Sequence, residues 1–187
     1  MADLDANPPL TCDGAMTRLP LYISYGMPKS GSTLAFELTR TMLDLAGVPQ
    51  VKIADGVTDP EAKINFVNRL DGAAYLALCE ASAGIEHPLV IKTHSRLFPA
   101  VSKALKSGKL TGHAVCRDPR DMALSMLDAA REGRAWGDSA EGKFETVADT
   151  GPRLHKSIKM FMKWAECSNI IPIPVSYTHL TLPTTRE

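Results

Sequence analysis

Hydrophobic positions along the chain form two patterns: short continuous runs, and longer stretches in which apolar residues recur every three or four positions. The continuous runs, which predict strands, are 21–25, 89–92, 114–117 and 170–175. The periodic stretches, which predict helices, are 33–46, 60–82, 98–105 and 153–167. Because strands and helices alternate, the pattern predicts an α/β fold in which helices flank a parallel central sheet.

A further helix is expected directly after the run 114–117. There Asp118 is suited to the N-cap, because its carboxylate can accept from the first backbone N–H groups, and Pro119 is suited to the first helical position. The first predicted helix, 33–46, has four apolar residues at helical spacing: Leu34, Leu38, Met42 and Leu45.

We expect one domain over residues 20–176, preceded by a loose tail at 1–19. The polar, glycine-rich segment 131–152 predicts a long loop, and both a lid and a disordered segment fit that composition. Residues 177–187 resemble translated sequencing-adapter sequence more than a natural protein, and a natural β-rich tail is the alternative. We therefore expect a non-native end at 177–187 and a domain that is incomplete at its C-terminus.

Composition and charge argue against a protein that binds nucleic acid, a membrane or a metal. The 187 residues are 44% apolar and 22% charged, with a formal net charge of zero, which is typical of a soluble globular domain. A neutral chain has no overall field to attract nucleic acid or an anionic membrane, so we expect neither as a partner. The four cysteines are far apart, without the paired spacing of a metal site, and no apolar signal core is present. These features predict a cytoplasmic protein without a metal.

A loop of small residues, PKSGST at 28–33, connects the first strand to the first helix. The N-terminus of a helix presents unpaired N–H groups, which bind phosphate or sulfate. Gly31 lets the backbone approach such an anion, Lys29 adds a charge, and Ser32 and Thr33 add hydroxyl donors. The loop is not a Walker A sequence, because its lysine precedes the glycine. It predicts an anion site, although a purely structural turn is the alternative.

The second strand also ends in polar residues. His94 follows the strand at the edge where ligands bind in open α/β sheets, so it is a candidate general base. Lys92, two residues earlier, lies on the same strand face and can reach the same ligand. For Lys92, an edge lysine in solvent is the alternative.

The third strand ends in Arg117. Its planar guanidinium suits a phosphate monoester, and Ser125, two turns into the next helix, is expected to face the same anion. The alternative is an ion pair between Arg117 and Asp118 or Asp121, with Ser125 turned toward solvent.

Together the three segments resemble the family of sulfotransferases that use 3′-phosphoadenosine 5′-phosphosulfate (PAPS). PKSGST resembles the phosphosulfate loop of the cytosolic-type members, and IKTH at 91–94 resembles a K-T-H segment whose histidine is the catalytic base. CRDPRDMALS at 116–125 resembles the 3′-phosphate motif, in which a serine follows an arginine by eight residues. The resemblance covers roughly residues 21–127. It implies a three-layer architecture like that of P-loop NTPases.

The resemblance also implies an activity and roles for residues. The activity is transfer of a sulfuryl group from PAPS to a hydroxyl or amine of a small acceptor without a metal, and a homodimer is compatible with it. His94 would be the base, Lys29 would stabilise the leaving oxygen, and Lys92 would contact the sulfuryl group. The residues implied to bind PAPS are Lys29, Ser30, Gly31, Ser32, Thr33, Arg117 and Ser125.

Two other functions compete with this one. A P-loop nucleoside kinase or NTPase needs a Walker lysine and a magnesium-binding carboxylate, and neither has its usual position here. A non-catalytic nucleotide-binding module needs only the anion loop. The chain also departs from the family's pattern, because Leu34 stands where an aromatic residue often stacks on adenine. The late glycine-rich segment is missing, and the tyrosine expected near adenine falls at Tyr177.

Overall fold

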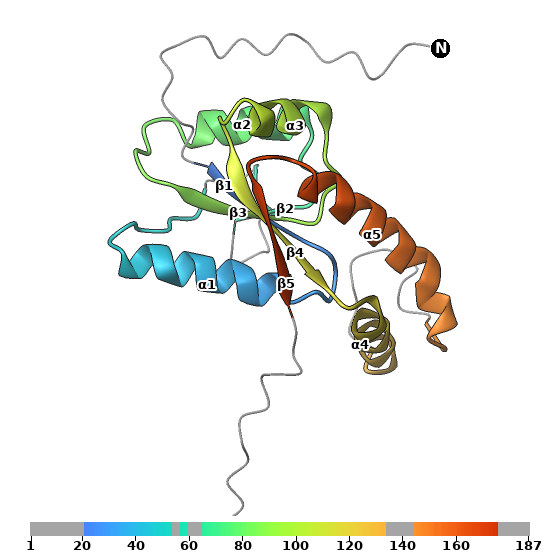
Figure 1. Cartoon of the computed structure of the whole chain (residues 1–187). Coiled ribbons are helices and arrows are strands. Elements are labelled where there is room, and N and C mark those ends of the chain that lie inside the picture. Colours follow the sequence, from blue (N-terminus) through green and yellow to red (C-terminus); the bar gives the residue numbers. More distant parts are fainter. Residues whose placement is uncertain (1–20, 54–56, 60–64, 134–143, 176–187) are drawn as a thin grey trace, which may run out of the picture.

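The computed structural model describes residues 21–53, 57–59, 65–133 and 144–175, which form five parallel strands and the helices around them (Figure 1). The strands are β1 (Leu21–Gly26), β2 (Phe66–Val67), β3 (Leu89–Thr93), β4 (Thr111–Arg117) and β5 (Ile170–Val175). The helices are α1 (Ser32–Leu45), α2 (Gly72–Ala81), α3 (Pro99–Lys106), α4 (Pro119–Arg131) and α5 (Gly151–Ala165), with a 3-10 turn η2 (Ala148–Thr150) before the last. The predicted α/β class with a parallel sheet is confirmed.

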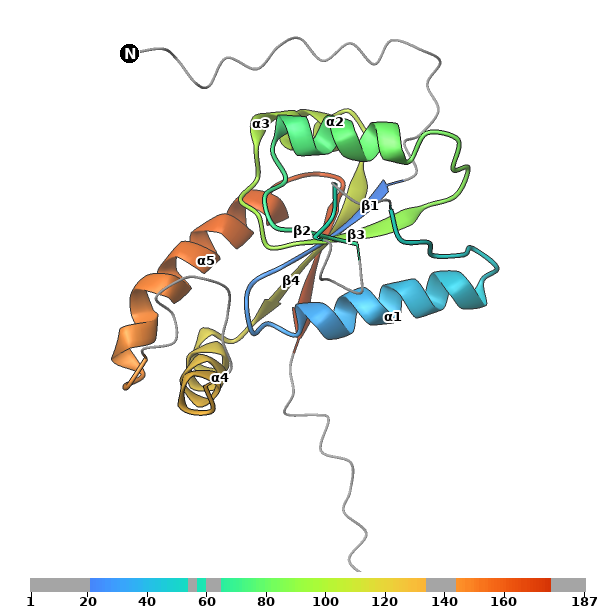
Figure 2. The same ribbon diagram turned by 180° about the vertical axis from the view of Figure 1, so that it is seen from behind.

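The order of strands across the sheet is β2-β3-β1-β4-β5, so the first strand lies in the middle. From β1 the chain crosses to the β2 edge, whereas the later connections all run in the opposite direction. Because such crossovers are right-handed, the reversal puts α1 on one face and α2, α3 and α5 on the other. Figures 1 and 2 show α1 below the sheet and α2 and α3 above it. The three layers are therefore helix, sheet and helix.

The larger core lies between the sheet and the layer of α2, α3 and α5. Its fully buried side chains include Ile23, Tyr25, Leu89, Leu105 and Trp164. A smaller methionine-rich cluster packs Met27 of the first loop against α4 and α5, and so joins that loop to the helices beyond β4. Its buried members are Met27, Met122, Ala123, Met126 and Leu154.

Helix α1 uses little of its apolar surface for packing on the sheet. Phe36 is fully buried, but the four residues that predicted the helix lie on its outer side. The exposed fraction rises along this stripe, from 44% at Leu34 to 84% at Leu45. Helical spacing therefore identified the helix correctly, and the periodic face points away from the core.

The helix predicted over 60–82 is wrong in the part of its first half that the structure describes. Phe66 and Val67 form β2 and pair with the end of β3, and α2 begins only at Gly72. The physical reason is Asp71, whose carboxylate accepts from the backbone N–H of Ala74 at 3.1 Å and fixes the helix start there. Residues 60–64 lie outside the described residues.

The remaining elements agree with the sequence to within a few residues. Asp118 caps α4 and Pro119 is its first residue, as predicted. The expected loop at 131–152 ends early, because α5 starts at Gly151. Residues 134–143 and the two predicted ends, 1–19 and 177–187, lie outside the described residues. Within the described ranges, none of the helices has the length and apolar character needed to cross a bilayer.

Candidate functional site

The loop after β1 turns tightly between the strand and α1. Ser30 closes the turn, because its backbone N–H and its hydroxyl both donate to the carbonyl of Met27, at 3.2 and 2.7 Å. Gly26 admits no side chain, since a Cβ there would lie 2.3 Å from the Cβ of Ser32. This close packing brings the N-terminus of α1 back against the end of its own strand.

Two residues of the loop lie in the left-handed region of backbone conformation. Lys29 and Gly31 have positive φ angles of 61° and 85°, and Lys29 is the only non-glycine residue in the described ranges with such an angle. Gly31 is also the N-cap of α1 and supplies no side-chain cap. The first N–H groups of α1 are thus left for a ligand or water.

His94 is bound directly to this loop region. Its Nδ1 lies 2.6 Å from the carbonyl oxygen of Gly26, and its ring meets the edge of Phe66 with centroids 5.5 Å apart. The pKa of His94 is lowered to about 4, mainly by burial and also by the charges of Lys92 and Arg153, while the hydrogen bond to Gly26 acts in the opposite direction. The imidazole is therefore neutral at neutral pH. Because a carbonyl can only accept, Nδ1 carries the proton and Nε2 keeps its lone pair.

Lys92 extends from β3 to the first turn of α1. Its Nζ donates to the hydroxyl of Thr33 at 2.7 Å and lies 6.0 Å from the centroid of the Phe66 ring. Burial lowers its pKa, and the carboxylate of Glu37 partly offsets that effect. The side chain is buried, so the alternative of an edge lysine in solvent is wrong.

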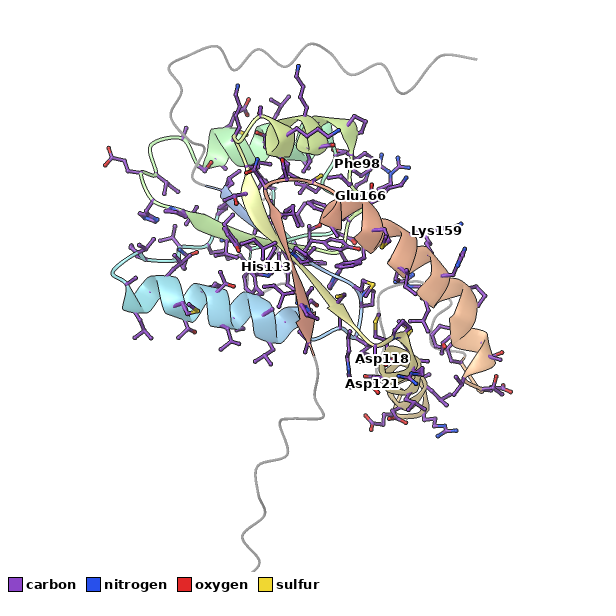
Figure 3. The ribbon with its side chains drawn as sticks, viewed as in Figure 1. Phe98, His113, Asp118, Asp121, Lys159 and Glu166 are labelled. Atoms are coloured by element: carbon purple, nitrogen blue, oxygen red, sulfur yellow. The ribbon has the colours of Figure 1, made fainter. Side chains whose placement is uncertain are left out.

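Arg117 and Ser125 lie on the neighbouring strand and helix. The Nε of Arg117 lies 3.4 Å from a carboxylate oxygen of Asp121, which is one of the two ion pairs foreseen as an alternative. Asp118 pairs instead with Arg120, at 2.6 Å, on the exposed side of α4. Figure 3 shows Asp118 and Asp121 at the start of α4, just beyond the end of β4. Ser125 is half-buried in the second turn of the same helix.

The predicted residues thus form one connected group and one adjacent group. Thr33 of the loop contacts Lys92, and Gly26, where the strand before the loop ends, contacts His94. Arg117 and Ser125 are linked to the loop through the backbone. That link is the N–H of Met27, which donates to the carbonyl of Val115 in β4 at 3.3 Å. Both groups lie where parallel strands end, which is the usual ligand-binding edge of such sheets.

Several contributors were not foreseen from the sequence. Gly26 holds the imidazole, Phe66 contacts it from β2, and the charge of Arg153 reaches it from α5. Phe66 was hidden inside a predicted helix, and the long separation of Arg153 from His94 left no local signal. The described residues contain no cluster of three or more metal-ligating side chains.

A pocket of about 430 Å³ lies elsewhere, between α3 and the end of α5. Figure 3 labels Phe98, directly before α3, and Glu166, directly after α5, and both line this pocket. None of the predicted site residues contributes to this pocket, and the polar groups that could perform chemistry converge at the sheet edge instead. The residues that line the pocket are Leu97, Phe98, Pro99, Ser102, Lys106, Lys163, Glu166 and Cys167.

Comparison with known proteins gives similarity at the level of structure. Neither a protein-family model nor a curated protein matches the sequence. Among solved structures, the chain is similar to mouse sulfotransferase SULT7A1 complexed with PAP, with a TM-score of 0.47 and 17% identity over 84% of this chain and 52% of that one. The likeness is one of fold.

A second similar structure is retinol dehydratase in complex with androsterone and the inactive cofactor PAP. It has a TM-score of 0.45 and 18% identity, and the match covers 84% of this chain and 54% of that one. A third is the complex of retinol dehydratase with retinol and PAP, with the same TM-score and identity and 55% of that chain covered. The chain spans about half the length of the proteins in these structures.

Proposed function

We propose that this chain transfers a sulfuryl group from PAPS to a hydroxyl or amine of a small acceptor. The observation that carries the proposal is the 2.6 Å contact between His94 Nδ1 and the carbonyl of Gly26. It ties a neutral imidazole to the residue from which the anion loop starts, so a base and an anion site lie together. PAP, named in the similar structures, is the nucleotide that PAPS would leave behind. A cytoplasmic setting belongs to the same proposal.

The proposed transfer is an in-line displacement at sulfur. Nε2 of His94 takes the proton from the acceptor while the acceptor oxygen or nitrogen forms its bond to sulfur. The bond from sulfur to the bridging oxygen breaks, and that oxygen leaves with its electron pair on the 5′-phosphate of PAP. Lys29 stabilises the charge that develops there. The proton later passes from His94 to solvent, so the products are PAP, the sulfated acceptor and a proton.

The other residues position the donor. The N–H groups of residues 31–33 and the hydroxyls of Ser32 and Thr33 hold the 5′-phosphosulfate, while Ser30, whose N–H and hydroxyl both donate to Met27, keeps the loop in shape. Lys92 adds a buried positive charge next to Thr33. Arg117 and Ser125 bind the 3′-phosphate, which requires Arg117 to exchange part of its contact with Asp121 for the ligand. The transition state of such a transfer is loose, so positioning and charge stabilisation account for most of the acceleration.

Arg117 provides the test of the nucleotide. We expect Arg117→Ala to weaken binding of PAP about 10- to 150-fold, because a hydrogen bond to a charged group contributes about 1.5–3 kcal/mol. Binding of 5′-AMP, which lacks the 3′-phosphate, should change little. Isothermal titration calorimetry of both nucleotides with both proteins measures the difference.

Arg120→Ala is the matched control, since it removes the same charge from a largely exposed side chain three residues away that pairs with Asp118. It should leave the affinity for PAP unchanged. Equal losses for PAP and 5′-AMP in Arg117→Ala would contradict the assignment. Binding of PAP by the unaltered protein without sulfuryl transfer from PAPS to any phenol, alcohol or amine would favour the non-catalytic binding module.

A further inference from the structure

Trp164, near the end of α5, makes two specific contacts in the core. The side chain is fully buried, and its Nε1–H donates to the backbone carbonyl of Ser95 at 3.0 Å. Its ring stacks on Tyr25, with centroids 4.9 Å apart and planes 14° from parallel. The face of the indole thus contacts Tyr25 in β1, and its N–H binds Ser95 in the segment after β3.

These two contacts flank the hydrogen bond that holds His94. Ser95 directly follows His94, and Tyr25 directly precedes Gly26, whose carbonyl receives the proton of Nδ1. The indole therefore bridges the two backbone segments that the His94–Gly26 contact joins. A shift of either segment changes the distance and angle of that contact.

The segment from Thr93 to Ser95 is fixed from its other side by β2 and the turn after it. The hydroxyl of Thr93 donates to the carbonyl of Val67 at 2.7 Å and accepts from the N–H of Ser95 at 3.0 Å. The hydroxyl of Ser95 accepts from the N–H of Leu70, also at 3.0 Å. His94 is thus carried by a short segment held between two elements, and Trp164 supplies the hold from α5.

The polar end of Trp164 argues for more than core filling. A phenylalanine would fill most of the same space, yet the indole N–H donates to the backbone carbonyl of Ser95, the residue directly after His94. The opposite end of the same helix carries Arg153, whose charge lowers the pKa of His94. Helix α5 therefore affects the imidazole of His94 in two ways. Trp164 holds the backbone next to His94, and the charge of Arg153 lowers its pKa.

We infer that Trp164 is a positioning residue for His94: by binding Ser95 and stacking on Tyr25, it keeps the imidazole in the orientation and tautomer in which Nε2 accepts the acceptor's proton. The inference rests on the proposed role of His94 as base. Its structural part, the control of the imidazole by Trp164, is independent of any activity.

The first test changes Trp164 to phenylalanine and observes the imidazole itself. In the unaltered protein, ¹⁵N NMR of the histidine side chains at pH 7 should show a protonated Nδ1 and an unprotonated Nε2 for His94, with the signal assigned by its loss in His94→Ala. In Trp164→Phe the two nitrogen shifts should move toward each other, as both tautomers become populated. Unchanged shifts in a folded variant would overturn the inference.

A second variant separates the N–H from the shape of the ring. Benzothienylalanine at position 164 has sulfur in place of the indole N–H, so it keeps the stack on Tyr25 and removes only the bond to Ser95. It should shift the His94 signals in the same direction as Trp164→Phe, and it remains informative if the phenylalanine variant does not fold. Shifts identical to those of the unaltered protein would show that the hydrogen bond does not position His94.

A third test measures the turnover of sulfuryl transfer with two acceptors. With an alcohol acceptor, Trp164→Phe should lower kcat about 10- to 100-fold, the usual cost of a base displaced by a fraction of an ångström to an ångström. With a nitrophenol the loss should be clearly smaller, because that acceptor needs less help to lose its proton. A purely structural defect would lower both rates by one factor, through a smaller folded fraction, and that result would count against positioning.

Asn169→Ala is the matched control. Its side-chain N–H also donates to a backbone carbonyl, that of Leu105 at 2.6 Å, but at the far end of α3. It should lower stability and leave the His94 signals and the ratio of the two acceptors unchanged. If the unaltered protein transfers no sulfuryl group, the proposed function fails, while the NMR shifts still decide whether Trp164 holds His94.

Discussion

His94→Ala is expected to lower the turnover of sulfuryl transfer by ~10²–10⁴-fold, the usual effect of removing a general base. Binding of PAP should remain nearly intact, because His94 acts on the acceptor and is hydrogen-bonded to the carbonyl of Gly26. Steady-state rates with a simple alcohol acceptor, together with calorimetry of PAP, measure the two quantities. Full activity of His94→Ala would show that the base is another group.

Lys29→Ala is the variant with which His94→Ala is to be compared. Lys29 is proposed to contact the leaving oxygen, so its loss should lower both turnover and binding of the donor. Replacing the alcohol by a nitrophenol should partly restore His94→Ala, since the acceptor is then readily deprotonated, and should not restore Lys29→Ala. If both variants respond alike to the acidity of the acceptor, the separation of roles between base and leaving-group stabiliser is wrong.

The second large effect is a loss of stability in mild acid. Burial lowers the pKa of both His94 and His113 from 6.5 to about 4 in the folded protein. Between these pH values the unfolded chain binds protons that the folded chain does not, so the free energy of unfolding falls as the pH falls. The expected loss is about 3 kcal/mol for each histidine between pH 6.5 and 4.

His113 is the residue on which to measure this effect, because it has no part in the proposed reaction. It lies within the sheet (Figure 3). The hydroxyl oxygen of Ser24 is 2.8 Å from its Nε2, and the hydroxyl oxygen of Tyr22 is 3.2 Å from its Nδ1. Urea unfolding at several pH values should show that His113→Gln removes about half of the histidine-dependent slope. A slope unaffected by His113→Gln would refute the prediction.

Local signals in the sequence were enough to predict most of the fold. Asp118 and Pro119 located the start of α4, because capping depends only on adjacent residues, and apolar runs located four of the five strands. The strand that was missed, β2, has only two residues and depends on pairing with β3 for its existence. A two-residue strand carries no periodicity of its own, so residues around it were assigned to a helix.

The candidate site was predictable where its chemistry is local and unpredictable where it depends on packing. The residue types at 28–33 were enough to predict an anion-binding loop. The hydrogen-bond partner of His94, in contrast, is the backbone carbonyl of Gly26, 68 positions earlier. Every residue has a backbone carbonyl, so the sequence does not indicate which of them accepts this hydrogen bond. The same holds for Trp164, whose apolar neighbours on α5 predicted a helix, while its hydrogen bond to Ser95 depends on how α5 crosses the sheet.

The central place of β1 in the sheet has a consequence for synthesis of the chain. Its two partners, β3 and β4, end at residues 93 and 117, so β1 must wait for about 90 further residues before both of its edges are paired. At ribosomal rates of about 5–20 residues per second, that delay is roughly 5–20 s. During this time the apolar strand and the outward stripe of α1 are exposed together on the nascent chain. The apolar strand β1 therefore does not have both of its sheet neighbours paired along its full edges until Arg117 has been synthesised.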